Sequence, residues 1–442
     1  MRRPLGSMMS MLGHIDAVHG AYYLLIHVLA KLGTSEAVLR MPSVVAMAAA
    51  AWFTAALGRD LAGARTGLAC GLLFAVSPVT TEYAHDARPF ALVTCLAALA
   101  SYRFVSFVRT GTRRDAAWYG AVLAACGLMN VFGMLLVVSH AVTLAASPVR
   151  ADRVRRFGFA AGAATLVVSP VAWLAATEIS QVGWERKPSA YIVFGLLTSL
   201  VVAGIAARVA VRGARSSSVQ SSATLGTAPL IRLSAAWLLL PLAILLIASQ
   251  IPIPAAPGAS ISASAGAGIW EPRYLLFCIP GLVLFVVGLI SRLNVKISII
   301  VTSAVMAGAV AAQPLARPAT SSDDIRAVAT LLQARSRDGD AVVFPDIAKR
   351  LIKDAYPAGF THVTDVGLDR SPAARNSLYG LNASPRILWQ RLAGTKRVWL
   401  VTFPVPRPGR YYGHATRPRA FCLERTWRFP LNMVRLYHRC RQ

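Results

Sequence analysis

A carboxylate, two imidazoles and two phenols lie within ten residues near the start of the chain, from His14 to Tyr23. Asp16 is the only carboxylate of this stretch, which makes it a candidate general base for a hydroxyl nucleophile. His19 could hydrogen-bond to a phosphate, an acceptor or a metal ion. A structural interpretation stands beside this one: Asp16 would cap the next helix and His19 would pack at a membrane interface. For Tyr22 and its neighbour an interfacial aromatic belt is favoured over catalysis.

A second polar cluster follows the helix-breaking pair Ser77-Pro78 and consists of Glu82, His85, Asp86 and Arg88. Asp86 is a further candidate for acid or base catalysis, and the other three could line a pocket. Arg88 is the candidate phosphate contact, because a guanidinium donates two parallel hydrogen bonds. The alternative is a solvated or ion-paired helix end.

Further binding residues are expected in two later segments. Arg273, directly before an apolar run, is the best second phosphate ligand, with Tyr274 beside it; the alternative is a membrane anchor. Gln181 and Trp184 could bind sugar or lipid, the indole by stacking, although interface anchoring is equally consistent with the sequence.

The composition assigns these residues to an integral membrane protein. Hydrophobic residues make up 55% of the chain, charged residues 15%, and the mean hydropathy is +0.53. The net charge of +27 does not indicate nucleic-acid binding, because much of the Lys and Arg falls in short gaps between apolar runs. That distribution follows the positive-inside rule.

About ten spans alternate across the bilayer in this reading. Residues 20 to 33 are too short to cross and predict an interfacial or partly inserted helix. Asn130 should hinge a pair of short spans. The strongly basic gaps all fall on one side, which is predicted to be cytoplasmic, and the polar clusters fall on the other. The spans are expected over the apolar runs 42–57, 66–79, 90–108, 116–126, 131–146, 157–177, 191–207, 233–248, 274–290 and 297–312.

The composition changes near residue 318, which predicts a membrane domain over residues 1–317 and a second domain over 318–442. Helix-like and strand-like runs alternate in the second domain, so it is expected to be a small α/β domain outside the cytoplasm. Trp427 and Phe429 begin a pattern typical of edge strands, which could bring Cys422 close to Cys440. These two cysteines could pair in an oxidising compartment, and the other four read as small buried hydrophobes.

Several short motifs follow one another along the chain: His19-Gly-Ala-Tyr22-Tyr23, Ser35-Glu36, Leu39-Arg40-Met-Pro42-Ser43, Gly58-Arg59, Tyr83-Ala-His85-Asp86-Ala-Arg88-Pro89 and Glu271-Pro-Arg273-Tyr274. In this order they resemble the polytopic membrane glycosyltransferases of the GT-C fold. The resemblance is greatest to actinobacterial family-39-like (protein-mannosyltransferase or ArnT-like) mannosyltransferases. It covers most of the chain, including the C-terminal domain.

The resemblance implies sugar transfer, of mannose or a similar sugar, from a polyprenyl-phosphate donor in the lipid bilayer. The acceptor would be an envelope glycan or a protein at the outer face of the plasma membrane. Such enzymes carry an acidic base in the first outside loop, after a first transmembrane helix. Here that helix and the acidic pair would precede Arg2, so the chain is expected to lack them.

Two other classes stay open, an inactive scaffold or partner protein and a transporter. The transporter is less favoured because matching pairs of broken helices are not evident. No cofactor is implied with certainty; a divalent metal could use Asp16, His19 and Asp86, but no spacing is diagnostic.

Overall fold

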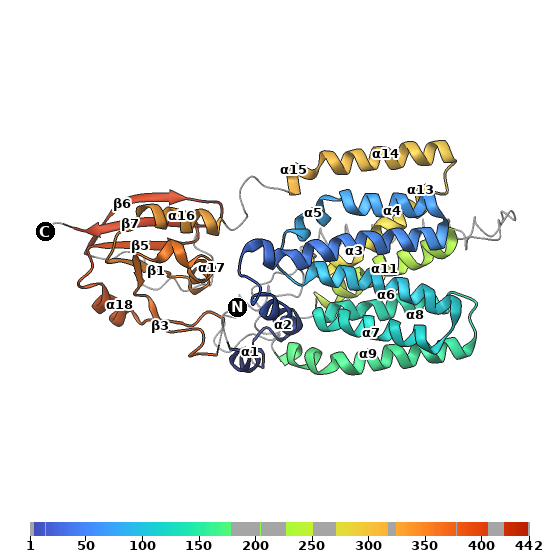
Figure 1. Ribbon diagram of the computed structural model, residues 1–442, viewed down its shortest axis with the longest axis horizontal. Helices are drawn as coiled ribbons and strands as arrows, with labels where there is room; N and C mark the ends of the chain where they lie inside the picture. Colours follow the sequence, from blue (N-terminus) through green and yellow to red (C-terminus); the bar gives the residue numbers. More distant parts are fainter. Residues whose placement is uncertain are drawn as a thin grey trace. The chain divides into compact units, whose positions relative to one another are not determined.

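The computed structural model describes residues 4–13, 15–177, 204, 227–250, 271–316, 324–376, 378–404 and 420–440. Its contacts divide the chain into a helical unit from Asp16 to Arg317 and an α/β unit from Pro318 to Gln442 (Figure 1). The short helix α1 (Leu5–Leu12) belongs by its contacts to the second unit, whereas the predicted domain 1–317 includes it. Within that second unit the Asn376 amide donates a 2.7 Å hydrogen bond to the Ser10 hydroxyl.

The helical unit is a bundle whose long helices run roughly parallel or antiparallel to one another (Figure 1). Three 3-10 segments, η1 (Ala17–His19), η2 (Val131–Leu135) and η4 (Pro272–Cys278), lead into the helices α2, α8 and α13. The helices are α2 (Gly20–Leu29), α3 (Glu36–Ala62), α4 (Ala64–Val76), α5 (Pro78–Ala84), α6 (Phe90–Thr110), α7 (Arg113–Met129), α8 (Leu136–Ala145), α9 (Ala151–Thr177), α11 (Thr227–Ala248), α13 (Ile279–Ile290), α14 (Val295–Ala311) and α15 (Gln313–Ala316).

Five helical segments of the described residues are long and apolar enough to cross a membrane: α3, α6, α9, α11 and the continuous run Pro272–Ile290. Four shorter apolar segments, including Ala17–Leu29 and Val295–Ala311, accompany them. The chain is therefore a multi-pass membrane protein. The predicted fold class, a transmembrane helical bundle with a C-terminal α/β domain, is confirmed. The span expected over 191–207 lies almost wholly outside the described residues.

Local chemistry explains where the helices end. Gly63, with a φ of 94°, ends α3 and lets the chain reverse at once into α4. Ser77 ends α4 before Pro78 opens α5, as the sequence predicted. Asn130 hinges α7 and α8, because its extended backbone stops the first helix while its side chain accepts a 3.0 Å hydrogen bond from the Phe132 amide.

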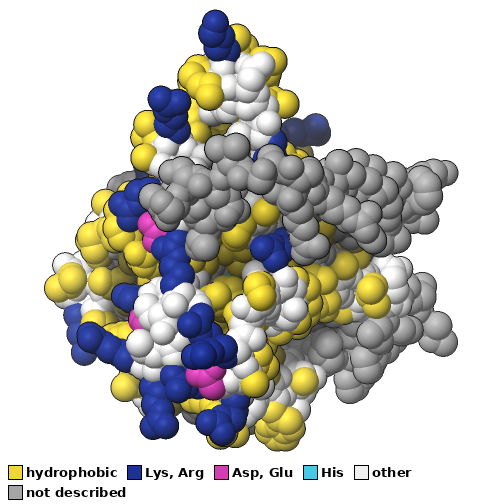
Figure 2. All heavy atoms as spheres, turned by 90° about the vertical axis from the view of Figure 1, so that its right-hand side faces the viewer, with side chains coloured by type: hydrophobic (Ala, Val, Ile, Leu, Met, Phe, Trp, Pro, Cys, Tyr) yellow, Lys and Arg dark blue, Asp and Glu magenta, His cyan; other side chains and the backbone are white. Residues whose placement is uncertain are grey.

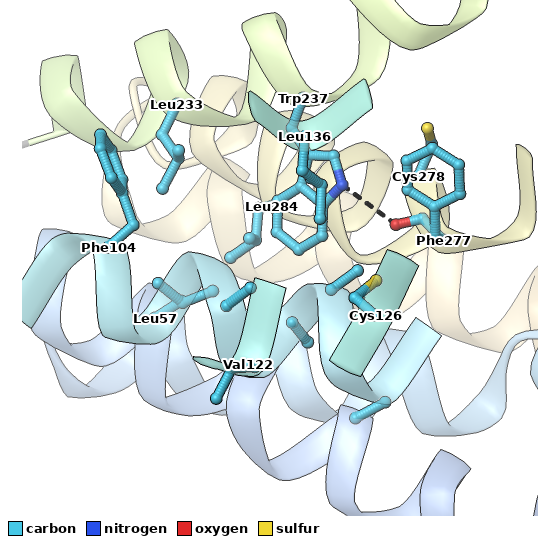
Figure 3. Close-up of a cluster of buried hydrophobic side chains, with 14 of the residues drawn as sticks. Leu57, Phe104, Val122, Cys126, Leu136, Leu233, Trp237, Phe277, Cys278 and Leu284 are labelled. Atoms are coloured by element: carbon cyan, nitrogen blue, oxygen red, sulfur yellow. Dashed lines mark hydrogen bonds between the residues drawn. The ribbon is translucent and has the colours of Figure 1, made fainter. Parts of the chain in front are cut away.

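The core of the bundle forms where α6, α11 and the run Pro272–Ile290 meet α3 and α7 (Figure 3). Trp237 is fully buried, and its indole N–H donates a 3.0 Å hydrogen bond to the Phe277 carbonyl, so the one polar atom of the ring is satisfied. Gly67 lets α4 approach α3 closely, since a Cβ there would lie 2.6 Å from the Ala55 carbonyl oxygen.

One end of the bundle is strongly basic, and we call it the basic end. Figure 2 views it and shows Lys and Arg side chains across the face with few acidic ones. Arg109 pairs with Asp60. Arg153 donates to the carbonyl of Val108 in the last turn of α6, and Arg156 donates to the carbonyl of Gly111, directly after that helix. The basic gaps among the described residues therefore gather at one end, as the positive-inside rule requires.

The second unit contains a five-stranded sheet in the order β2-β1-β5-β7-β6 and a two-stranded sheet of β3 and β4. The pairs β1–β2 and β1–β5 are parallel, whereas β7 runs antiparallel to both neighbours. The strands are β1 (Asp340–Val343), β2 (Val363–Asp365), β3 (Leu368–Arg370), β4 (Leu381–Asn382), β5 (Arg397–Thr402), β6 (Phe421–Arg428) and β7 (Met433–Arg439). The helices α16 (Ile325–Arg335), α17 (Leu351–Ala355) and α18 (Pro385–Leu392) and the 3-10 segments η5 (Ile347–Arg350) and η6 (Pro357–Phe360) complete it.

The last two strands differ in part from the prediction. Of these two strands, β6 lies at an edge of the five-stranded sheet, while β7 lies inside the sheet because it pairs with both β5 and β6. Cys422 and Cys440 form a disulfide across the β6–β7 pair, with their Cα atoms 5.2 Å apart. Cys70, Cys126 and Cys278 are free and buried, and Cys95 is free and half-buried.

Candidate functional site

Asp16 is the centre of a small hydrogen-bonded group. The His19 Nδ1 lies 2.6 Å from Asp16 Oδ1, and the Tyr23 hydroxyl donates to Asp16 Oδ2. The backbone of Asp16 is left-handed, with a φ of 62°, a conformation that Asp tolerates better than most residues. An uncommon backbone held by side-chain bonds is often found at functional sites.

The expectation that Asp16 caps the following helix is wrong. Its side chain makes no capping hydrogen bond to the first turn of η1. A capping residue normally has an extended backbone, and the left-handed backbone of Asp16 directs the carboxylate to His19 and Tyr23 instead. Both carboxylate oxygens are thereby oriented, yet each keeps a lone pair for another donor.

The ring of Phe90, the first residue of α6, joins three segments that are far apart in the sequence. The His19 and Tyr83 rings contact it edge-on at centroid distances of 6.3 Å each. The Tyr274 ring lies 6.2 Å away, and the Arg273 guanidinium lies 5.8 Å from the Phe90 ring centre. The three predicted segments therefore converge on one buried ring, and we call these five residues the Phe90 cluster.

Arg273 is the best-sheltered cation of the predicted binding residues. Its side chain is 21% exposed and lies 3.8 Å from Glu271. Arg273 and Tyr274 are neighbours on η4, and the Tyr274 ring stacks on the Phe132 ring at a centroid distance of 4.8 Å. Since η2 and η4 bring these aromatic rings together, the position of Arg273 is set by packing on both sides of its own segment.

Asp86 and Arg88 pair with each other at 3.7 Å, and both side chains are well exposed, at 39% and 50%. The fully buried Ser43 hydroxyl donates a 2.6 Å hydrogen bond to the Asp86 carbonyl, which ties this segment to α3. Tyr22 links the two predicted clusters, because its phenol lies within electrostatic range of Asp86 and Arg88. The Tyr22 hydroxyl is buried and has no hydrogen-bond partner among the described residues.

Tyr83 faces a mixed field of charges. Burial raises the pKa of the Tyr83 phenol, the Glu82 carboxylate raises this pKa further, and Arg273 lowers it. The phenol is therefore protonated at neutral pH and can donate a hydrogen bond. Glu82 itself is exposed.

His85 does not join the Phe90 cluster. Its Nδ1 lies 2.7 Å from the Thr81 carbonyl oxygen, within the same turn of α5. The imidazole borders a shallow hollow of about 210 Å³ whose lining includes Met47, Ala51 and Thr80. Among the described residues, His85 forms no hydrogen bond or ring contact with Asp16 or His19, although all three were predicted site residues.

Two predicted binding residues, Gln181 and Trp184, lie outside the described residues. No group of three His, Cys, Asp or Glu side chains suited to a metal ion occurs in the described ranges, so Asp16, His19 and Asp86 do not form one. Sequence reasoning missed Phe90 and Ser43 as members of the site. Phe90 reads as the first apolar residue of a span, and only its position directly after Arg88-Pro89 could have drawn attention to it.

Part of the sequence matches a known protein family. Residues 20–175, which carry the Asp86 segment and Tyr23 of the Asp16 group, match the family described as dolichyl-phosphate-mannose-protein mannosyltransferase. No curated protein matches the sequence significantly.

Two solved structures are similar to this one over 95% of the chain and 86% of theirs. The apo form of ArnT from Cupriavidus metallidurans aligns with a TM-score of 0.54 at 11% identity. The form of the same protein bound to undecaprenyl phosphate aligns with a TM-score of 0.50 at 12% identity. At this identity the likeness establishes the fold, which is that of the GT-C polytopic glycosyltransferases, and the resemblance seen in the sequence is confirmed.

Proposed function

We propose that this protein is a membrane glycosyltransferase that moves a sugar from a polyprenyl-phosphate donor to an acceptor hydroxyl. The observation that carries the proposal is the convergence of Asp16 with His19, Tyr83 and Arg273 around Phe90. A base, a neutral hydrogen-bond donor and a sheltered cation are the three groups that this transfer requires. The GT-C fold and the family match of residues 20–175 support the same donor class.

Asp16 would act as the general base. As the acceptor hydroxyl attacks the anomeric carbon, its proton passes to the Asp16 carboxylate and a new C–O bond forms. His19 and Tyr23 are positioning residues in this scheme, because they hold the two carboxylate oxygens and leave lone pairs for the acceptor.

Arg273 would stabilise the leaving group. The bond between the anomeric carbon and the phosphate oxygen breaks, and the electron pair stays on the polyprenyl phosphate. A guanidinium held by Glu271 and the Phe90 ring is already oriented to offset this charge, and the Tyr83 hydroxyl could donate beside it. Arg88 would bind donor phosphate less strongly, since its side chain is more exposed and is paired with Asp86.

The position of the reaction is also a proposal. The Phe90 cluster lies at the start of α6, and the basic end of the bundle lies at the other end of that helix. If the basic end faces the cytoplasm, the cluster faces outward in the plasma membrane. The Cys422–Cys440 disulfide supports an extracytoplasmic second unit, because disulfides persist in oxidising compartments. Mannose or a similar sugar, and a glycan or protein of the cell envelope, are the proposed substrates.

The deciding experiment measures transfer of radiolabelled sugar from polyprenyl-phosphate donors by the full chain in proteoliposomes. We expect Asp16→Asn to lower kcat by roughly 10²- to 10⁴-fold, the usual contribution of a general base. Asp152→Asn is the matched control, because Asp152 is an exposed carboxylate at the basic end, and it should retain the wild-type rate. A wild-type rate for Asp16→Asn would refute the proposed base.

The second candidate is a scaffold or partner protein without transfer activity. The ion pair between Asp86 and Arg88 favours this candidate, because each side chain binds the other and not a substrate. Donor binding without turnover by the wild-type protein, across a panel of mannosyl and other sugar donors, would support the scaffold and contradict the enzyme.

A further inference from the structure

A cationic side chain lies within an apolar span, far from the Phe90 cluster. Arg103 belongs to α6 (Phe90–Thr110) and precedes the end of that helix by about two turns. Charged side chains at such depth are rare, and they usually have a defined partner or a function. Phe90 and Arg103 are separated by about 20 Å along α6, so this position is independent of the proposed donor site.

The surroundings of Arg103 leave it incompletely satisfied. The side chain is half-buried, and its Nε is buried without a hydrogen-bond partner among the described residues. The guanidinium lies 5.8 Å from the centre of the Trp118 ring on the adjacent helix α7. Trp118 is 50% exposed, so the pair borders the outer surface of the bundle.

The nearby acid offsets only part of the positive charge at this place. Asp115 is one carboxylate within electrostatic range of two guanidiniums, those of Arg103 and Arg114. Its Oδ2 accepts hydrogen bonds from the Thr110 and Thr112 hydroxyls at 2.5 and 2.7 Å. Within the part of the chain that the structure describes, neither Arg103 nor Arg114 forms an ion pair with a carboxylate. Positive charge is therefore in excess at this place.

Aromatic rings lie next to Arg103 on the other side of α6 as well. Tyr102 contacts Trp52 and Phe53 of α3 at centroid distances of 6.3 and 6.0 Å. Trp52 is exposed, as Trp118 is. Tryptophan and tyrosine gather at the level of lipid headgroups, so Arg103 lies where a lipid phosphate would be within reach of its guanidinium.

We propose that Arg103, Arg114 and Trp118 form a binding site for an anionic phospholipid at the basic end of the bundle. The guanidiniums of Arg103 and Arg114 would donate to the phosphodiester, and the exposed Trp118 ring would pack against the glycerol and upper acyl region. A phospholipid satisfies both halves of the site, because free phosphate would use the arginines but leave the indole uncovered. The excess of positive charge selects lipids with a net negative headgroup over zwitterionic ones.

The test uses the full chain in nanodiscs of phosphatidylcholine to which phosphatidylglycerol is added in steps, with the midpoint of thermal unfolding as the readout. We expect phosphatidylglycerol to raise the midpoint in the wild-type protein. In Arg103→Gln the apparent affinity should fall roughly tenfold or more, the loss of one or two charge-assisted hydrogen bonds. Arg65→Gln is the matched control: Arg65 is an exposed arginine at the basic end, near the start of α4, and its loss should leave the titration unchanged.

A second readout keeps the proposal testable if Arg103→Gln folds poorly. Brominated phosphatidylglycerol should quench wild-type tryptophan fluorescence more than brominated phosphatidylcholine does, and Trp118→Phe should abolish that difference. The same difference in Trp118→Phe as in wild type would overturn the site. Equal losses of lipid affinity in Arg103→Gln and Arg65→Gln would also overturn it, in favour of general attraction to the basic end. Equal stabilisation by inorganic phosphate in phosphatidylcholine nanodiscs would overturn the lipid as ligand.

Discussion

The Arg273 guanidinium lies 5.8 Å from the centre of the Phe90 ring, which joins the start of α6 to the segment before α13. The rings of His19 and Tyr83 also contact the Phe90 ring, edge-on. A cation over an aromatic face is stabilised by the ring quadrupole, and a buried ring holds the cation in one place. The Phe90 ring therefore connects Arg273, the proposed phosphate ligand, to His19, which bonds to the proposed base Asp16.

Replacing Arg273 should weaken the binding of the donor and leave the fold intact. In Arg273→Gln the KM for the polyprenyl-phosphate donor should rise about 10- to 100-fold, since charge-assisted hydrogen bonds contribute about 1.5–3 kcal/mol. Arg273→Lys should recover part of this loss, because it keeps the charge and loses the two-pronged geometry. Arg292→Gln, which removes a guanidinium bonded to Thr227 at the basic end, serves as the control. An unchanged donor KM in Arg273→Gln would exclude this phosphate contact.

Phe90 should matter to stability and to activity by separable amounts. Phe90→Ala removes a ring that is 4% exposed and should destabilise the protein by about 3–5 kcal/mol. Phe90→Leu keeps most of the volume but loses the ring edges and face that contact His19, Tyr83 and Arg273. We expect it to unfold within a few degrees of wild type and to transfer sugar at least tenfold more slowly, roughly the value of one or two aromatic or cation–π contacts.

Phe107→Leu provides the comparison for that variant, because Phe107 is buried on the same helix toward the basic end. Its unfolding midpoint should shift by a similar amount while its transfer rate stays near wild type. If both leucine variants lost activity equally, Phe90 would be one core residue among many.

His85 should be dispensable for transfer, in contrast to His19. The His85 ring lies 2.7 Å from the carbonyl oxygen of Thr81 in the preceding helix α5 and borders a hollow whose lining includes no residue of the Phe90 cluster. His85→Asn is expected to keep the rate within about threefold of wild type, whereas His19→Asn should lose at least tenfold because Asp16 loses a positioning partner. Transfer assays on both variants at equal expression decide this, and an equal loss in both would return His85 to the site.

The order of the helices could be read from the sequence because the signals are local. Ser77-Pro78, Gly63 and Asn130 each end or begin a helix through backbone chemistry that involves a few neighbouring residues. The two polar segments could also be found, since carboxylates and imidazoles are scarce beside apolar runs. Their common centre could not, because Phe90 differs from other apolar residues only through contacts made by distant segments.

Two predictions were wrong because they concern features that the local sequence pattern does not determine. Asp16 does not cap the helix because its backbone is left-handed, a conformation that no local pattern encodes. The strand β7 reads as an edge strand from its alternation, yet its place between β5 and β6 depends on which strands pair with it. Periodicity identifies a strand and its buried face; it does not give the order of strands in a sheet.

The turn between α6 and α7 predicts a dependence of stability on pH. Hydrogen bonds from the Thr110 and Thr112 hydroxyls lower the pKa of Asp115. A carboxyl with a lowered folded-state pKa stabilises the protein above its usual value of about 4, and this stability is lost as the pH falls through the lowered pKa.

Thr112→Ala should therefore lower the unfolding midpoint at neutral pH, by the equivalent of about 1 kcal/mol including the lost helix cap. The difference in unfolding midpoint between this variant and the wild-type protein should become smaller toward pH 3. Thermal unfolding in detergent between pH 7 and pH 3 measures this. Thr143→Ala is the control, since the Thr143 hydroxyl donates only to a carbonyl of its own helix and should show no such convergence.

The Cys422–Cys440 disulfide allows the orientation of the second unit to be measured on intact cells. If this unit lies outside the cytoplasm, a membrane-impermeant maleimide should label the protein only after an impermeant reductant has been added. The remaining cysteines should stay unlabelled, because Cys70, Cys126 and Cys278 are buried within the bundle and Cys95 is half-buried there. The Cys422→Ser/Cys440→Ser double variant is the control and should not be labelled under any of these conditions. Losing the cross-link should also destabilise the second unit by about 3 kcal/mol, the value for a closed loop of this size.

Labelling of the wild-type protein that requires permeabilised cells would instead place the second unit, and with it the end of α14, on the cytoplasmic side. That result would contradict the orientation inferred from the basic end.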